Sequence, residues 1–398
     1  MNVTSPKHFV IPGDGTQADN GCLLQESFVP QDNPDNLISK QVDFWLTTVN
    51  SAGVIPLLSV VGVPGNVLSA AVFYTQGLRE RINLCVFSLA LVDIVVLIVT
   101  LCLSVEQVYR AFVGPSSFFI TYFTGLTGFT WVSMFLSAAI STERCVCVVS
   151  PLRAQRMLPG WTLRGVLLLA STVLLTGMLV IAGPKHTIVC VYDPLTNVTS
   201  DIVYVTQYYK DNKKVLDILD VFIYATALPF IFLVVIVVTT SVTAVKLRSA
   251  ARWRQQSSSA QPGAPSAAEH RDSREVALTK MLIATSVLFI VCLCPMLLVQ
   301  VAMFLVPELK FGGRYHNMTS VLWSVISVFR CANSSFNFFV YHHLGSRFRN
   351  TLRQIARCRR ARIRSGSADP INLSGRQEAF RPDCGKIGVH VVSQHVRE

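Results

Sequence analysis

The chain has 398 residues, of which 51% are hydrophobic and only 15% are charged, and its mean hydropathy is +0.46. This composition is too apolar for an ordinary soluble domain and indicates a membrane protein. The formal net charge of +12 does not indicate a nucleic-acid partner, because the basic residues lie between and after hydrophobic runs and form no stripe with interleaved aromatic residues.

Residues 1–50 form a polar segment ahead of the first apolar run. Acidic residues outnumber Lys7 and Lys40 in it, and it lacks the basic start and apolar core of a signal peptide. Its polar composition, dotted with Pro and Gly, predicts a flexible extracellular segment. The first apolar run would then serve as an uncleaved membrane anchor.

Seven apolar runs follow, and each is long enough to cross a bilayer, which takes about 20 residues of helix. Their limits are 51–75, 84–108, 117–148, 161–183, 216–245, 276–305 and 317–343. The sequence therefore predicts an all-α membrane protein in which residues 51–343 form a seven-transmembrane helix bundle.

The basic residues of the loops set the predicted orientation. They follow the first, third, fifth and seventh runs, at Arg79 and Arg81, Arg153 and Arg156, residues 246–254 and residues 347–364. Because Lys and Arg gather on the cytoplasmic side of a membrane, we expect an extracellular N-terminus and a cytoplasmic C-terminus in the plasma membrane.

Three Asn-X-Thr sequons fall in segments assigned to the outside and are candidate N-glycosylation sites: Asn2, Asn197 and Asn317. The sequon at Asn333 lies within an apolar run and that at Asn372 lies in the tail, where no glycan can be attached. The distribution supports the predicted orientation.

Beyond the seventh run, apolar residues recur at helical spacing with arginines opposite them. They are Leu344, Phe348, Leu352 and Ile355. The pattern predicts an amphipathic helix over residues 344–357 on the anionic inner leaflet. Cys358 is a candidate palmitoylation site, with a free thiol as the alternative. Residues 358–398 are expected to form a disordered cytoplasmic tail.

Several spans carry polar side chains that crossing a bilayer does not require. They are Asn66, Asp93, Ser133, Asn333, Ser334 and Asn337. A carboxylate near the bilayer centre costs roughly 2.5–3.5 kcal/mol on insertion scales, so Asp93 is expected to face inward and find partners. Carboxylate, hydroxyl and amide oxygens would suit a sodium ion. The alternative is a hydrogen-bonded cluster that joins helices without an ion.

A charged pair, Glu143-Arg144, stands where the third run ends. Ionisable residues at such a place indicate a functional site. The alternative is that Arg144 reaches the lipid headgroups and only anchors the helix.

The chain resembles the rhodopsin-like G-protein-coupled receptors over residues 50–357. The motifs that carry the resemblance are, in order, Gly65-Asn66-Val67, residues 89–93, Glu143-Arg144-Cys145, Pro151-Leu152, Pro229, residues 289–295, and residues 337–341 followed by Phe348. Each motif is weak alone, whereas all of them in this order and spacing are specific.

The resemblance implies a role for each matching residue. Glu143 and Glu275 would restrain Arg144 until activation releases it toward a heterotrimeric G protein, and Tyr341 would swing inward. Further members of the coupling surface would be Pro151 and Leu152. The allosteric sodium pocket would comprise Asp93, Ser133, Asn333, Ser334 and Asn337. The packing switch between the two halves of the bundle would comprise Met134, Pro229, Phe289 and Pro295.

The resemblance also implies receptor kinases and arrestin as partners and no enzymatic activity. An intramembrane enzyme would need a nucleophile or metal constellation, and none is visible in the sequence. The 11 cysteines lack zinc-ligand spacing. No cofactor is therefore expected apart from a sodium ion.

The sequence departs from the family pattern at several positions. Phe338 replaces the proline of the seventh span, Leu293 the tryptophan of the sixth, and Val237 a tyrosine of the fifth. The family bridges the outer end of the third span to the second outer loop, but the third-span position is Phe119. The remaining candidate disulfide is Cys22–Cys190, with two free thiols as the alternative.

The ligand is predicted from the same comparison. Leu126 stands where amine receptors carry an aspartate, and no lysine lies near Arg330 to bind retinal. The long loop 183–215 is rich in Tyr and Lys, which favours an extended neuropeptide. The alternative is a small-molecule chemosensory receptor. An ion-coupled transporter would show broken helices and an internal repeat, which are not visible here.

Overall fold

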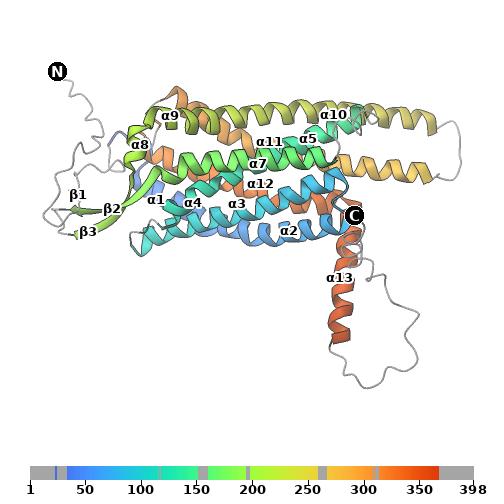
Figure 1. The fold of residues 1–398 in the computed structure, drawn as a ribbon, viewed down its shortest axis with the longest axis horizontal. Coiled ribbons are helices and arrows are strands. Elements are labelled where there is room, and N and C mark those ends of the chain that lie inside the picture. Colours follow the sequence, from blue (N-terminus) through green and yellow to red (C-terminus); the bar gives the residue numbers. More distant parts are fainter. Residues whose placement is uncertain are drawn as a thin grey trace.

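The computed structural model describes residues 23–24, 34–114, 116, 118–150, 160–193, 198–258, 267–306, 308–309 and 313–366. Long helices run side by side along one axis, and a small β-sheet lies at one end of them (Figure 1). This end is called the sheet end below, and the opposite end, from which α13 departs, is called the α13 end.

Seven helical segments run along the bundle in the described part of the chain, several of them joined from shorter pieces. In order they are α1 (Lys40–Val49), η2 (Asn50–Val54) and α2 (Ile55–Gln76); α3 (Arg81–Phe112); α4 (Phe118–Phe123), η3 (Thr124–Thr127) and α5 (Gly128–Val149); α7 (Gly160–Ala182) with η4 (Gly183–Lys185); α8 (Gln207–Asp211), α9 (Lys213–Asp217), η5 (Ile218–Ala227) and α10 (Leu228–Ser258); α11 (Ala267–Leu305); and α12 (His316–Leu344).

Six of these segments, all except α12, are long and apolar enough to cross a membrane, judged over the described residues. The 29-residue α12 is also long enough, but polar side chains such as Arg330, Asn333 and Asn337 lower its apolar content. The predicted fold class, an all-α membrane bundle, is confirmed.

The first helical segment begins earlier than the sequence predicted. Residues 40–49 were expected to belong to a flexible segment, whereas they form α1, which continues through η2 into α2. The Ser39 hydroxyl caps the helix by accepting a hydrogen bond from the amide of Val42 at 3.3 Å. Apolar residues spaced three or four apart, such as Val42 and Trp45, suit a helix whose outer face meets lipid.

A three-stranded sheet, which the sequence analysis did not predict, lies in the loop after α7. Strand β2 (His186–Asp193) pairs antiparallel with β3 (Val198–Val205), and β1 (Leu23–Leu24) pairs parallel with β2. Both long strands are rich in Val, Ile and Thr, which favour extended backbone. The sheet ties the N-terminal part of the chain to this loop.

Glycines on α2 let α12 approach closely. A Cβ at Gly62 would meet the Ser335 hydroxyl, and one at Gly65 would lie 2.9 Å from the Cβ of Phe338. Both pairs are spaced by three residues, so they share one face of each helix. Small residues at such a contact are typical of membrane helices. Phe338, which stands where the family has a proline, therefore packs against Gly65 within an uninterrupted α12.

The helix after the bundle, α13 (Ser346–Gly366), starts two residues later than predicted and extends beyond residue 357. It lies across the bundle axis (Figure 1), as expected for a helix on a membrane surface. Phe348 is 2% exposed and packs between Phe73 and Tyr341, with ring centroids 5.6 and 5.9 Å away. Arg347 pairs with Glu80 at 2.8 Å, so both a ring and a charge fasten α13 to the bundle.

Candidate functional site

Asp93 lies at the centre of a polar cluster inside the bundle. The residue is on α3 and is completely buried. Its Oδ1 accepts hydrogen bonds from the hydroxyls of Ser133 on α5 (2.8 Å) and Ser334 on α12 (2.9 Å). Its Oδ2 accepts one from the side-chain amide of Asn337 on α12, at 2.9 Å. The carboxylate therefore joins three helices, and these bonds offset part of the cost of its burial.

Asn66 on α2 adds a fourth helix to this cluster. Its side-chain amide donates to the carbonyl of Gly62, at 3.0 Å, and to the carbonyl of Ser334, at 2.8 Å. The second bond fixes the backbone of α12 at the residue whose hydroxyl contacts Asp93. The register of α12 against α2 and α3 is thus set by polar groups as well as by packing.

Four of the five residues predicted for the sodium pocket meet at this point. A carboxylate beside two hydroxyl groups supplies the oxygen ligands that suit a hard cation such as sodium. Asn333, the fifth, makes no hydrogen bond with Asp93 in the described part of the chain, and instead lines a neighbouring cavity. No cluster of three or more His, Cys, Asp and Glu that could hold a metal ion occurs among the described residues.

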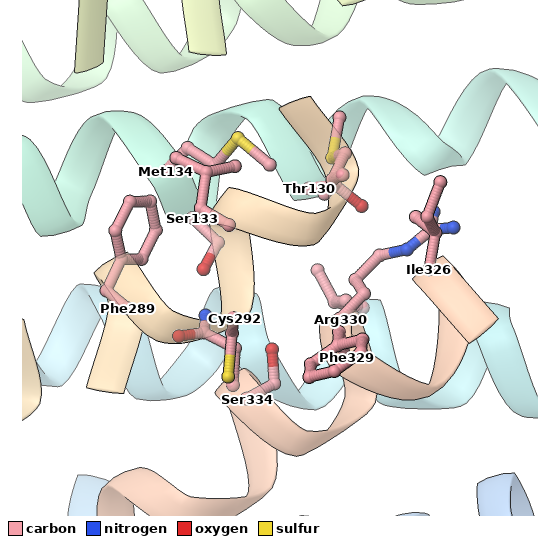
Figure 2. Close-up of a pocket in the computed structure, with 13 residues that line it drawn as sticks. Thr130, Ser133, Met134, Phe289, Cys292, Ile326, Phe329, Arg330 and Ser334 are labelled. Atoms are coloured by element: carbon pink, nitrogen blue, oxygen red, sulfur yellow. The ribbon is translucent and has the colours of Figure 1, made fainter. Parts of the chain in front are cut away.

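A cavity lies beside the cluster, between α3, α5, α11 and α12 (Figure 2). Ser133 and Ser334 line it, so the hydroxyls that hold Asp93 also form part of its wall. Most of the remaining wall is apolar, and Arg330 is the single charged residue among the described residues that line it. Its volume, measured as room for the centres of water molecules, is about 30 Å³. That is space for about two ordered waters or one small functional group.

Only two of the four residues predicted for the packing switch lie together at the cavity. Met134 and Phe289, 6% and 4% exposed, both line the cavity. Pro229 is buried on α10, just after the π-helical η5, and Pro295 lies within α11. Neither proline lines the cavity. Pro229 has no N–H to donate to a carbonyl of the preceding turn, so the backbone bond at this position is missing where η5 passes into α10.

Glu143 stands between two arginines at the α13 end of the bundle. The Nε of Arg144 lies 3.0 Å from its Oε2, and the Nε of Arg81 lies 3.8 Å from its Oε1. The thiol of Cys147 donates to Oε1 at 3.2 Å. The predicted Glu143–Arg144 contact is therefore present. Arg81 was predicted only as a loop charge, although its place next to the second span is visible in the sequence.

Three other residues of the predicted coupling surface lie outside the described structure, in whole or in their side chains. Glu275 lies on α11, but its side chain is outside the described part of the structure. Pro151 and Leu152 lie outside the described residues. Tyr341 is described, is 2% exposed, and meets Phe73 edge-on with ring centroids 5.5 Å apart.

Glu106 fastens the third helical segment at the sheet end. The side chain is 2% exposed. Its Oε1 accepts from the Ser116 hydroxyl (3.0 Å) and the amide of Phe119 (3.1 Å), and its Oε2 accepts from the amide of Ile120 (2.7 Å). Phe119 is where the family pattern has its cysteine. The absence of this cysteine was visible in the sequence. The role of Glu106 was not, because a single acid at a helix end carries no distinctive pattern.

The second outer loop is held to the bundle by charged and aromatic groups. Lys185 pairs with Asp220 at 2.8 Å and lies 5.1 Å from the ring centroid of Tyr209. The hydroxyl of Tyr209 donates to Asp217. Burial, followed by this hydrogen bond, raises the pKa of Tyr209 above its ordinary value, so the phenol stays a donor at neutral pH.

Cys190 is disulfide-bonded, and its predicted partner, Cys22, lies outside the described residues. The residues that follow these two cysteines, Leu23 and Val191, are paired in the β1–β2 register. Cys358 on α13 is also disulfide-bonded and is not a free thiol. A disulfide sulfur cannot be acylated, so palmitoylation stays a prediction for the reduced form of Cys358.

One predicted glycosylation site conflicts with the structure. Asn317 is completely buried, and its side-chain amide donates to the carbonyl of Ile38 at 3.0 Å. A glycan on this nitrogen would displace the contact between α12 and the residues before α1, which makes Asn317 an internal structural residue. Asn2 and Asn197 lie outside the described residues.

The chain matches the profile of a known protein family. The profile of the family described as "7 transmembrane receptor (rhodopsin family)" matches residues 65–341, which is more than half of the chain. The matched region runs from Gly65 on α2 to Tyr341 on α12. It contains the Asp93 cluster, the cavity and the Glu143–Arg144 pair. A comparison with curated proteins gave no match.

Proposed function

Because the chain belongs to the rhodopsin family of seven-transmembrane receptors, we propose that it binds an extracellular ligand, most simply a neuropeptide, and activates a heterotrimeric G protein. Proteins of this family are receptors and not enzymes. We include in the proposal an extracellular N-terminus, a cytoplasmic C-terminus, and arrestin and receptor kinases as later partners.

The observation that supports the proposal most strongly is that Ser133 and Ser334 belong both to the cavity wall and to the Asp93 cluster. A ligand group in the cavity would touch Ser133 or Ser334, whose hydroxyls bind Asp93. Asn337 continues the cluster along α12 toward Tyr341. A packed network with two arrangements is how a small shift at one site becomes a helix movement elsewhere. Ligand binding would thereby reach the Glu143–Arg144 pair at the α13 end.

The neuropeptide assignment is supported by the loop that covers the sheet end. It combines an extended hairpin with exposed side chains such as Tyr208, a surface that suits backbone and aromatic contacts with a peptide. The small size of the cavity favours the alternative, a small-molecule ligand. A peptide would insert one group into the cavity and rest the remainder on the loop, whereas a small molecule would use the cavity alone.

The test is nucleotide exchange on added G protein by the full-length receptor in membranes, with a neuropeptide library and then small organic molecules as ligands. Arg144→Ala is expected to reduce ligand-driven exchange at least about tenfold, as for loss of a contact worth roughly 1.4 kcal/mol or more, at unchanged surface expression. Arg353→Ala, which removes an exposed arginine of α13, is the matched control and should retain exchange. Undiminished exchange in Arg144→Ala would refute its coupling role.

A further inference from the structure

We propose that Arg330 is the anchor for a carboxylate group of the ligand, so that this receptor recognises an acidic ligand. The inference rests on the proposed function, because it assigns the chemistry of the ligand that enters the cavity. It depends on where Arg330 lies, on what the side chain does not contact, and on the size and character of the cavity.

Arg330 lies at the middle of the 29-residue helix α12, about as far from either end as the helix allows. An arginine there cannot reach the lipid headgroups as a terminal arginine does. Its side chain lines the cavity and runs away from the α12 backbone until its guanidinium lies beside Ile326 in the view of Figure 2. Arginine at this depth in a membrane protein is costly and indicates function.

The guanidinium is largely without partners. It carries five N–H donors, and among the described residues its single hydrogen bond runs from Nη2 to the hydroxyl of Ser327 at 3.2 Å. Its Nε is buried and has no hydrogen-bond partner in the part of the chain that the structure describes. Ser327 lies one turn earlier on the same helix, so this bond aims the guanidinium toward the sheet end and does not join α12 to another helix.

No acidic residue in the described part of the chain forms an ion pair with Arg330. Asp93 belongs to the cluster beside the cavity, but both its oxygens already accept hydrogen bonds from Ser133, Ser334 and Asn337. A charge held inside the bundle without a counter-charge is destabilising. It persists where a ligand supplies the missing charge, since binding sites trade stability for function.

The cavity selects a carboxylate among the possible anions. A guanidinium binds a carboxylate through two parallel N–H···O bonds, and about 30 Å³ holds one such group. A phosphate or sulfate would need more donors, whereas the remaining wall is mostly apolar, with Met134, Phe289 and Phe329 among its members. The expected ligand is thus an acid whose carboxylate adjoins an apolar group. It is either a small organic acid or a carboxylate of a peptide.

The experiment measures the thermal unfolding midpoint of the purified full-length receptor with a thiol-reactive dye, which reports exposure of the buried cysteines Cys85 and Cys331. The probes are matched pairs at millimolar concentration: benzoate with benzamide, 3-phenylpropionate with its amide, and N-acetyl-Phe-Leu with its C-terminal amide. Acids should raise the midpoint by about 2 °C or more, and the amides should not. A larger effect of the dipeptide acid indicates a peptide carboxylate, and a larger effect of benzoate indicates a small organic acid.

Variants decide whether Arg330 is responsible. Arg330→Gln should abolish the shift, Arg330→Lys should retain part of it, and Arg314→Gln, which removes an exposed arginine near the sheet end, should leave it unchanged. Without any probe, Arg330→Gln should raise the midpoint, because it removes a charge that has no counter-charge inside the bundle. A structural arginine would give a lower midpoint instead.

The proposal is overturned if no acid shifts the midpoint, if acids and amides shift it equally, or if Arg330→Gln responds to acids as the parent does. The assay contains no G protein. Acid-dependent stabilisation without nucleotide exchange would therefore refute the proposed coupling and leave this inference standing. Exchange driven only by uncharged ligands would do the reverse.

Discussion

Among single residues, Glu106 illustrates how one side chain can take over a structural task. In the family pattern a cysteine at the position of Phe119 fastens the outer end of the third span through a disulfide. Here the amide of Phe119 donates to Glu106 on α3, together with the amide of Ile120 and the Ser116 hydroxyl. A carboxylate that accepts three hydrogen bonds is a strong local anchor, since bonds to charged groups are worth about 1.5–3 kcal/mol each.

Glu106→Gln is expected to lower the thermal midpoint of the purified receptor. The substitution replaces one acceptor oxygen by an NH₂ group that faces the donors, so at least one bond is lost, at a cost of about 2 kcal/mol. Glu308→Gln, at an exposed position near the same end, is the control and should be neutral. A midpoint unchanged in Glu106→Gln would show that other contacts hold the third segment.

The second residue-level prediction concerns sodium at Asp93. If the carboxylate and its two hydroxyl partners bind the ion, sodium chloride should stabilise the parent more than potassium chloride does at equal ionic strength. Asp93→Asn removes the charge that attracts the ion and should remove the difference. Ser335→Ala, whose hydroxyl bonds to Leu58 and not to Asp93, should keep it. Equal effects of the two salts on the parent would contradict the sodium proposal.

At the level of elements, the contact between α2 and α12 depends on the absence of side chains. A Cβ at Gly62 would collide with Ser335 and lie 2.7 Å from a methyl group of Leu97. Gly62→Ala should therefore push α12 away from α2 and destabilise the receptor by about 1–3 kcal/mol. Gly53→Ala, on the same segment but with no atom within 4 Å of the added Cβ, should fold normally. Comparable midpoints for the two variants would exclude the close contact.

The sheet makes a second prediction at this level. Because Leu23 is in register with Val191, the preceding residues Cys22 and Cys190 are proposed to form a disulfide. Peptide mapping of the intact receptor under non-reducing conditions should recover the two cysteines in one cross-linked fragment, which reduction separates. Recovery of Cys22 with an alkylated thiol would rule the pairing out.

For the whole molecule, the features that extend over many residues were predictable from the sequence. The apolar runs located all seven segments, because crossing a bilayer requires length and hydrophobicity. The cost of burying Asp93 predicted that other polar residues would converge on it, and Ser133, Ser334 and Asn337 do so.

The features that the sequence did not predict depend on single contacts between residues that are distant in the chain. Arg81 was assigned to a loop, although it shares Glu143 with Arg144. Asn317 matched a glycosylation sequon, but its burial against Ile38 is a tertiary fact that no sequon reports. Residues 40–49 looked like a polar extracellular segment because their charges obscured the helical spacing of their apolar residues.

At the sheet end, the third helical segment and the loop after α7 are held by two separate contacts, and the two differ in their sensitivity to reducing agents. The family joins helix and loop by one covalent bond, whereas here Glu106 holds the helix and a disulfide at Cys190 holds the loop. Reducing agents can cut only the second of these fastenings. With the proposed partner Cys22, a reduced receptor would loosen its loop and its N-terminal strand while the third helical segment stays anchored, so ligand capture and helix packing would respond separately to reducing agents.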